Sequence, residues 1–291
     1  MHFGTRKYSG VKQLTIVTVC RNAAGTLPRT IMSVAQNKPD TVEYIIVDGA
    51  STDGTIDEVS KNMATVDMFV SEPDTGIYDA MNKGLALATG QFVWFLNADD
   101  WLSHDAVSHV LANLQDVDYL FGIAVTCSVD EAVQDLFKPA VDKEGHLGDL
   151  VTRGMFVPHP ATIVSTKLAR SLGFDSEYRI AGDYDFMIRL YAASRNYTYL
   201  PRVLTYFRSG GVSGRPGISE LFKVQDRNLA FLKTTLDSAE KRRRYYKYLL
   251  VQEQNDFYRS EVETIRRLQK GIQLPALTKI PLLIKRALKL L

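Results

Sequence analysis

The chain has 291 residues, a near-balanced formal charge of +2, 45% apolar residues and two cysteines. This length exceeds one average domain and suits a single large α/β domain with an appendage. Two cysteines far apart in sequence argue against a disulfide-rich secreted scaffold and favour a reducing compartment. We find no signal-peptide pattern and no run of 18 apolar residues, so we expect a cytoplasmic protein without a membrane-spanning helix.

The charge is unevenly distributed along the chain. From Lys241 to Leu291 there are 13 Lys and Arg against 4 Asp and Glu, a net of +9, which leaves −7 for residues 1–240. The acidic body argues against nucleic acid as a partner of the main domain. The stretch Lys279–Leu291 predicts a basic amphipathic helix, the kind that lies on an anionic membrane surface. Packing on the same domain or on a second copy fits it too, so self-association stays open.

Strands and helices alternate through the first hundred residues. Apolar, β-branched runs predict strands, and helical spacing follows each of them. The predicted strands are Leu14–Val19, Val42–Val47 and Met68–Val70, and the helices are 26–35, one from about Thr55, and 77–88. This alternation predicts a doubly wound, mostly parallel sheet of the Rossmann-like α/β class.

A fourth strand, predicted at Phe92–Leu96, runs directly into Asn97, Asp99 and Asp100. Open α/β sheets bind ligands at the carboxyl ends of their strands. A carboxylate there suits a hard divalent cation, and we favour this role for Asp99. For Asp100, a turn or the N-cap of the next helix fits the pattern equally well.

Two earlier segments also carry polar groups that can meet a ligand. Asp48 ends the second strand, where its carboxylate can accept a hydrogen bond from a base or a ribose, although a turn Asp without a ligand fits as well. In the helix predicted at 77–88, Asp79 and Asn82 are three residues apart and so are neighbours off the apolar face. Simple solvation of that polar face is the alternative.

Four motifs in chain order resemble the inverting nucleotide-sugar glycosyltransferases of family 2. They are Asn22, Asp48-Gly49-Ala50-Ser51, the segment 76–90, and Asn97-Ala98-Asp99. The resemblance covers about residues 14–213. It implies an A-type glycosyltransferase fold, in which two α/β subdomains abut and the first holds the nucleotide.

The resemblance also implies a donor site. Asp48 would meet the uracil or ribose, and Asp99 would bind Mn²⁺ or Mg²⁺ at the diphosphate. Asn97 stands where the family has the first Asp of an Asp-x-Asp motif, which removes one negative charge and weakens the metal site or places water in it. The nucleotide-sugar-binding residues are then Thr18, Val19, Asn22, Asp48, Asp79, Asn82, Asn97 and Ala98.

The second half supplies the acceptor side. A strand is predicted at Tyr119–Val125, and 130–148 reads as an irregular excursion. The stretch 179–190 predicts the start of a helix with Asp183 near its beginning, where the helix dipole keeps a carboxylate ionised; an N-cap without a catalytic part is the alternative. The resemblance implies that Asp183 is the general base, although Gly182 replaces the Glu that precedes it in the family.

Two further residues are candidates for acceptor or phosphate contacts. His159 lies between two prolines, which restrain its backbone, and we expect it outside any regular apolar face; a structural turn histidine is the alternative. Arg208 precedes Gly210 and Gly211, and its guanidinium can meet phosphate from a flexible lid. A plain surface loop fits this stretch equally well.

We therefore predict an N-terminal tail at 1–12, a catalytic domain at 13–215 and a helical basic extension at 216–291. The predicted function is transfer of a sugar, from UDP in the favoured case, to a hydroxyl of a lipid-linked glycan during cell-surface polysaccharide assembly. The protein would act peripherally at the inner face of the cell membrane. Alternatives are a catalytically silent nucleotide-sugar-binding scaffold and a transferase to polyprenyl phosphate.

Overall fold

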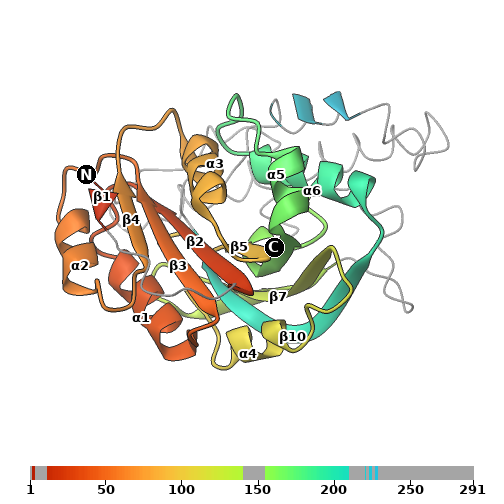
Figure 1. The fold of residues 1–291 in the computed structure, drawn as a ribbon, viewed down its shortest axis with the longest axis horizontal. Coiled ribbons are helices and arrows are strands. Elements are labelled where there is room, and N and C mark those ends of the chain that lie inside the picture. The colour runs from red at the N-terminus through yellow and green to blue at the C-terminus, as the bar shows by residue number, and fades with distance from the viewer. Residues whose placement is uncertain are drawn as a thin grey trace, which may run out of the picture. The chain divides into compact units, whose positions relative to one another are not determined.

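The computed structural model describes residues 2–3, 12–139, 155–209, 220, 223–224 and 227–228 (Figure 1). All of them belong to the first of two compact units, residues 1–235. The helix predicted at Lys279–Leu291 lies outside the described residues, as does most of the predicted basic extension. Within the part of the chain that is described, no helix has the length and apolar character needed to cross a bilayer.

Ten strands and six α-helices alternate along the described chain. The strands are β1 (His2–Phe3), β2 (Leu14–Cys20), β3 (Val42–Asp48), β4 (Met68–Ser71), β5 (Phe92–Phe95), β6 (Trp101–Leu102), β7 (Tyr119–Cys127), β8 (Val133–Phe137), β9 (Thr162–Ser165) and β10 (Tyr197–Arg208). The helices are α1 (Leu27–Asn37), α2 (Thr55–Lys61), α3 (Ile77–Leu87), α4 (Ala106–Leu111), α5 (Thr166–Leu172) and α6 (Gly182–Ala193), with a 3-10 turn η2 at His159–Ala161.

These strands form one sheet in the order β1-β4-β3-β2-β5-β9-β7-β10-β6, and β8 pairs with β7. Strands β4, β3, β2 and β5 are parallel, whereas β9 runs antiparallel to β5 and β7. The chain winds outward from β2 to β4 and then returns to place β5 on the other side of β2. The carboxyl ends of β2 and β5 therefore meet where the strand order reverses, the usual ligand position in such sheets.

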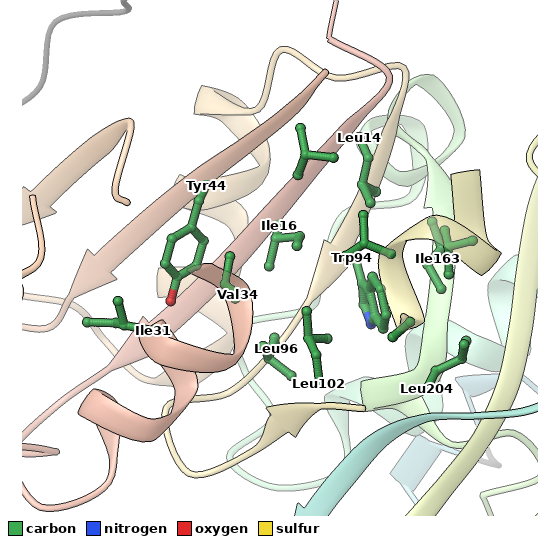
Figure 2. Packing of buried hydrophobic residues seen from close by; sticks show 14 of the residues in the cluster. Leu14, Ile16, Ile31, Val34, Tyr44, Trp94, Leu96, Leu102, Ile163 and Leu204 are labelled. Carbon is green, nitrogen blue, oxygen red and sulfur yellow. The ribbon is translucent and has the colours of Figure 1, made fainter. Parts of the chain in front are cut away.

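The main core lies between the sheet and α1 (Figure 2). Ile16 and Tyr44, from the neighbouring strands β2 and β3, are fully buried together with Ile31 and Val34 of α1. Alternate residues of β2 point to the opposite face, where α3 packs. There a Cβ on Gly84 would lie 2.4 Å from a methyl of Val17, so α3 approaches the sheet this closely only because residue 84 has no side chain.

One local prediction is wrong, and one is decided between its two alternatives, since Asp100 lies in a turn. The stretch predicted as irregular from residue 130 contains β8, which pairs antiparallel with β7. Asp100 is not a helix cap, because its amide donates to the Asn97 carbonyl at 3.1 Å in a turn that leads into β6, and α4 begins only at Ala106. The two-residue strand β6 separates the acidic turn from that helix and pairs with β10.

Candidate functional site

The loops after β2 and β3 are tied together by Asn22. Its backbone amide donates to the Ser51 hydroxyl at 2.7 Å, and its side-chain oxygen accepts from the Thr52 amide at 2.9 Å. Asn22 adopts a left-handed conformation with φ 52°, which asparagine tolerates better than most residues. Asn22 thus shapes the rim above the ends of the two strands.

Asp48 lies fully buried at the end of β3. Its carboxylate accepts from the Ser51 amide at 3.0 Å, from the Ser71 hydroxyl at 2.7 Å and from the Ser51 hydroxyl. A buried carboxylate is stable only when it is bonded in this way. A base or ribose that reached Asp48 would have to replace one of these serine contacts.

Thr18 and Val19 precede the end of β2, and their side chains are packed in the protein. Thr18 is fully buried and its hydroxyl accepts from the Tyr44 hydroxyl at 3.1 Å, while Val19 is 5% exposed. Their contribution to the base site stays a prediction, and any contact would be made where β2 ends rather than by freely exposed side chains.

The predicted polar residues of α3 bind other parts of the protein. Asp79 accepts from the Thr75 amide at 3.0 Å and pairs with Lys83 at 3.5 Å. The amide of Asn82 bonds both backbone groups of Phe174, donating to its carbonyl and accepting from its amide, each at 2.8 Å. Asn82 therefore fixes the segment that precedes α6 against α3.

The turn after β5 concentrates acidic and amide oxygens. Ala98 is buried at the turn, Asp99 is partly exposed, and Asp100 is fully buried with one carboxylate oxygen accepting from the Arg208 amide at 3.1 Å. Among the described residues, the Asn97 side-chain oxygen and the second Asp100 oxygen are buried without a hydrogen-bond partner. Burial raises the pKa of Asp99, and the charge of Arg208 opposes that rise.

An unpartnered buried oxygen beside carboxylates fits a hard cation, because such an ion satisfies lone pairs that no donor reaches. The described residues contain no group of three or more His, Cys, Asp or Glu side chains able to hold a metal by themselves. Magnesium-like ions are commonly bound by one or two carboxylates together with substrate phosphates. Asp99 and the Asn97 oxygen fit this second kind of site.

Arg208 is the last residue of β10 rather than part of a loop. Its guanidinium donates to the Val129 carbonyl at 2.6 Å, in the connection between β7 and β8. Its backbone binds Asp100 and its charge acts on Asp99, so Arg208 is placed beside the acidic turn. Gly210 and Gly211 lie outside the described residues.

His159 contradicts the prediction of a ring outside the apolar packing. It is 5% exposed, its ring stacks on Phe95 at 6.1 Å between centroids, and it meets Phe174 edge-on at 6.0 Å. Burial lowers the pKa of His159 to about 4, so the imidazole is neutral near pH 7. A neutral, packed ring has no charge to offer an anion.

Asp183 is the second residue of α6. One of its carboxylate oxygens accepts from the Tyr184 amide at 2.8 Å and lies 3.3 Å from the Tyr78 hydroxyl. Burial raises the pKa of Asp183 to about 6, against the lowering effect of these two hydrogen bonds. Burial thus outweighs the helix start that was predicted to keep the group acidic. The result is a carboxylate that is ionised at pH 7 and basic enough to accept a proton.

A single ring joins the parts of this site. Phe174 packs against Phe95 at 5.0 Å, Tyr78 at 5.9 Å and Phe186 at 4.4 Å between centroids. These rings belong to β5, α3 and α6, the elements that lead into the acidic turn, carry Tyr78 and present Asp183. Sequence reasoning missed Phe174 and Tyr78 as site residues, because their partners are remote in sequence.

The sheet order, with an acidic turn at the carboxyl end of β5, fits the A-type glycosyltransferase fold that the motifs predict. Residues 15–154 match the family model described as Glycosyl transferase family 2. A PGL/p-HBAD biosynthesis glycosyltransferase of Mycobacterium bovis is 30% identical over 212 residues, which cover 68% of this chain and 78% of the relative. The chain belongs to glycosyltransferase family 2.

Solved structures share the fold. Staphylococcus aureus TarS 1–349 in complex with UDP-GlcNAc has a TM-score of 0.63 and 20% identity, covering 81% of this chain and 71% of that one. The mannosyltransferase PcManGT of Pyrobaculum calidifontis in complex with GDP-Man and Mn²⁺ has a TM-score of 0.51 and 18% identity, covering 70% and 58%. The A-type fold predicted from the motifs is thereby confirmed.

Proposed function

We propose that this glycosyltransferase is an inverting enzyme that uses a divalent metal, takes its sugar from a UDP-sugar and employs Asp183 as the general base. The observation that carries the proposal is the Asp183 carboxylate, partly buried at the start of α6 and with its pKa raised to about 6 by burial. A base whose pKa lies just below the working pH is both ionised and effective.

The proposed reaction is a single displacement. Asp183 takes the proton of the acceptor hydroxyl as its oxygen attacks the anomeric carbon, and the bond from that carbon to the diphosphate breaks with its electron pair going to the leaving oxygen. One displacement inverts the configuration, and one carboxylate is enough, in contrast to the paired carboxylates of glycoside hydrolysis. The metal, held by Asp99 and Asn97 when bound, would supply positive charge to the departing diphosphate.

The choice of donor rests on the solved relatives and on the acidic turn. One similar structure holds UDP-GlcNAc and another holds GDP-Man with Mn²⁺. A nucleoside diphosphate is common to both donors, and it is the group that a metal held by Asp99 would bind. We propose a UDP-sugar as the donor, since the structure of TarS with a UDP-sugar is the more similar of the two. A GDP-sugar is the alternative that the test must include.

For the acceptor we propose a lipid-linked glycan at the cytoplasmic face of a membrane. The support is the basic end of the chain, which carries a net charge of +9 over Lys241–Leu291. Such a segment is attracted to anionic lipid, at about 1 kcal/mol per basic residue close to the surface. Residues 13–215 would then form the catalytic domain, and a polyprenyl phosphate is the competing acceptor.

The test is a donor panel. The purified chain is incubated with UDP- and GDP-linked sugars and Mn²⁺, without acceptor, with a lipid-linked glycan fraction, and with polyprenyl phosphate. We expect acceptor-dependent release of UDP that EDTA abolishes and that Asp183→Asn reduces by at least about 100-fold. Donor binding without turnover in every arm, unchanged by Asp183→Asn, would identify a silent scaffold instead.

A further inference from the structure

The hydroxyl of Tyr78 lies between two acceptors. It donates to the Ile180 carbonyl at 2.5 Å and lies 3.3 Å from an Asp183 carboxylate oxygen. The ring is buried and packed against Phe174 on α3's side of the site, so the hydroxyl has little freedom to leave. Burial and the Asp183 charge raise the pKa of Tyr78, which keeps the phenol protonated.

The Tyr78 hydroxyl can both donate and accept a hydrogen bond, so it can bind Asp183 in either protonation state of that carboxyl group. When Asp183 is ionised, the hydroxyl can turn toward it, because a carboxylate is the stronger acceptor. When Asp183 has taken a proton, it can donate to the Tyr78 oxygen while Tyr78 donates to Ile180. Both states of the base therefore keep a hydrogen bond to the same hydroxyl.

On the backbone side, Glu220 binds the turn that leads into α6. Its carboxylate accepts from three consecutive amides, those of Arg179 at 3.0 Å, Ile180 at 2.9 Å and Ala181 at 2.9 Å. Amides ahead of a helix are otherwise unpaired donors, and a carboxylate there satisfies them and complements the helix dipole. Glu220 also raises the pKa of Asp183 through its charge.

Two other described residues close to Glu220 in sequence, Arg227 and Asn228, also bind residues at and before the start of α6. Asn228 donates to the Asp185 carboxylate at 2.9 Å, and Arg227 pairs with Glu177 at 2.6 Å and with Asp175. The ion pairs of Arg227 are exposed to solvent and contribute little on their own. The bond from Asn228 to the buried Asp185 and the three amide bonds to Glu220 place these two residues at the start of α6.

We propose that the Tyr78 hydroxyl and the Glu220 carboxylate are paired positioning residues for Asp183, one binding its side chain and the other the backbone turn from which its helix begins. The inference rests on the proposed function, in which Asp183 is the base. The groups beside Asp183 in the described chain are Tyr78 from α3 and Glu220 from the 220–228 segment, together with the Tyr184 amide of α6 itself.

The two residues act on Asp183 with opposite signs. Tyr78 favours its charged form by donating a hydrogen bond, so Tyr78→Phe, which keeps the ring, should move the acid limb of the kcat profile to higher pH. Glu220 disfavours the charged form by repulsion, so Glu220→Gln, which keeps one acceptor oxygen for the amides, should move it to lower pH. A purely structural role would not produce opposed shifts.

The experiment measures kcat and donor KM from pH 5 to 9 for the full chain and the two variants. We expect kcat near neutral pH to fall about tenfold in each variant, because the base is less well oriented, with donor KM changed less than twofold. Tyr191→Phe, on α6 and packed against Phe156, controls for loss of a phenol. Glu177→Gln controls for loss of a nearby carboxylate, the one that pairs with Arg227. The inference would be overturned if the acid limbs of the two variants' kcat profiles coincided with that of the wild type, or if both moved in the same direction.

A second measurement does not depend on activity. The Asp183 carboxyl is titrated by carbon NMR on aspartate-labelled protein, with Asp183→Asn used to assign the signal. We expect the midpoint to rise in Tyr78→Phe and to fall in Glu220→Gln. If the Asp183 midpoint shifts as expected but Asp183→Asn stays active, Asp183 is not the base, although Tyr78 and Glu220 still act on its pKa. If Asp183→Asn is inactive but the midpoint does not shift, Asp183 remains the base and the positioning roles of Tyr78 and Glu220 are overturned.

Discussion

The ring of Tyr78 occupies the space that a side chain at Gly182 would need. A Cβ built on Gly182 would lie 2.7, 2.8 and 2.9 Å from three atoms of that ring, closer than such contacts ever come. The family pattern places a glutamate at this position, and the structure shows why this chain cannot. The Tyr78 ring fills that space instead, and its hydroxyl lies 3.3 Å from a carboxylate oxygen of the neighbouring Asp183.

Gly182→Ala tests this packing directly. The new methyl must push the Tyr78 ring aside, so we expect the free energy of unfolding to fall by about 1–3 kcal/mol. Loss of kcat should accompany it, because the displaced ring carries its hydroxyl away from Asp183. Urea denaturation and initial rates measure the two effects. Gly25→Ala is the matched control, since its Cβ would meet nothing within 4 Å; equal stability of the two variants would contradict the packing argument.

The pH dependence of catalysis follows from Asp183. With its pKa raised to about 6 by burial, kcat should climb as pH rises through 6 and then level off, because only the ionised carboxylate accepts a proton. The same shift lowers stability as pH rises, since a raised folded pKa stabilises fully below about 3.8 and loses that contribution above 6. Asp183→Asn should therefore remove activity without lowering the melting temperature at pH 7. A large drop in melting temperature would instead indicate a structural role.

Unlike Asp183→Asn, the substitution Asp48→Asn is expected to lower the stability of the fold. Its buried carboxylate accepts from both donors of Ser51 and from the Ser71 hydroxyl, and an amide in its place cannot accept all of these. Asp48→Asn should destabilise the fold by about 2–4 kcal/mol, as expected for loss of buried hydrogen bonds to a charged group. Thermal unfolding and UDP titration, run beside the exposed Asp130→Asn, separate the effects. Unchanged stability with lost UDP affinity would show that Asp48 binds the nucleotide directly.

Metal use is tested at Asp99. Its pKa is raised by burial and its charge acts against the buried Asp100, so the fold gains little from keeping it ionised. Asp99→Asn should leave the melting temperature unchanged or higher and abolish the increase in UDP affinity that Mn²⁺ produces. Calorimetric titration of UDP with Mn²⁺ and with EDTA provides the measurement. An equal Mn²⁺ effect in the variant would remove Asp99 from the metal site.

Local sequence pattern was enough to predict the parallel half of the sheet. Strands β2, β3 and β5 are buried on both faces, so their sequences are mostly apolar and β-branched or aromatic, unlike the helices between them. Strand β8 escaped prediction because Val133–Phe137 is mostly exposed and mixes polar with apolar residues without alternation. Its structure depends on pairing with β7 rather than on its own burial.

The sequence offers candidates for single site residues but not the remote partners that position them. Asp183 is a candidate because of the family resemblance and its place at the start of a helix. Tyr78 is 105 residues away from it, and Glu220 is about 40 residues beyond the amides it binds. The prediction for His159 was wrong because it too depends on remote partners. Its flanking prolines restrict the backbone, but Phe95 and Phe174, which are distant in sequence or on other elements, decide whether the ring is buried.

His159 gives the protein a predictable sensitivity to acid. Burial lowers its pKa to about 4 from 6.5, so between these values the unfolded chain binds a proton that the folded chain excludes. Stability should therefore fall as pH drops from about 6.5 to 4, with a contribution from this residue of up to about 3 kcal/mol. His159→Phe can keep the packing against Phe95 and Phe174 but has no proton to bind, so we expect its stability to fall less steeply over this range.

Urea denaturation at pH 4.5 and pH 7.5 measures the difference between the two slopes. His104→Phe, at an exposed position, controls for replacing a histidine with phenylalanine as such. The difference in stability between His159→Phe and wild type should grow in favour of the variant as the pH is lowered. The same difference at both pH values would mean that the His159 ring is protonated as readily in the folded protein as in the unfolded chain, which its burial against Phe95 and Phe174 should prevent.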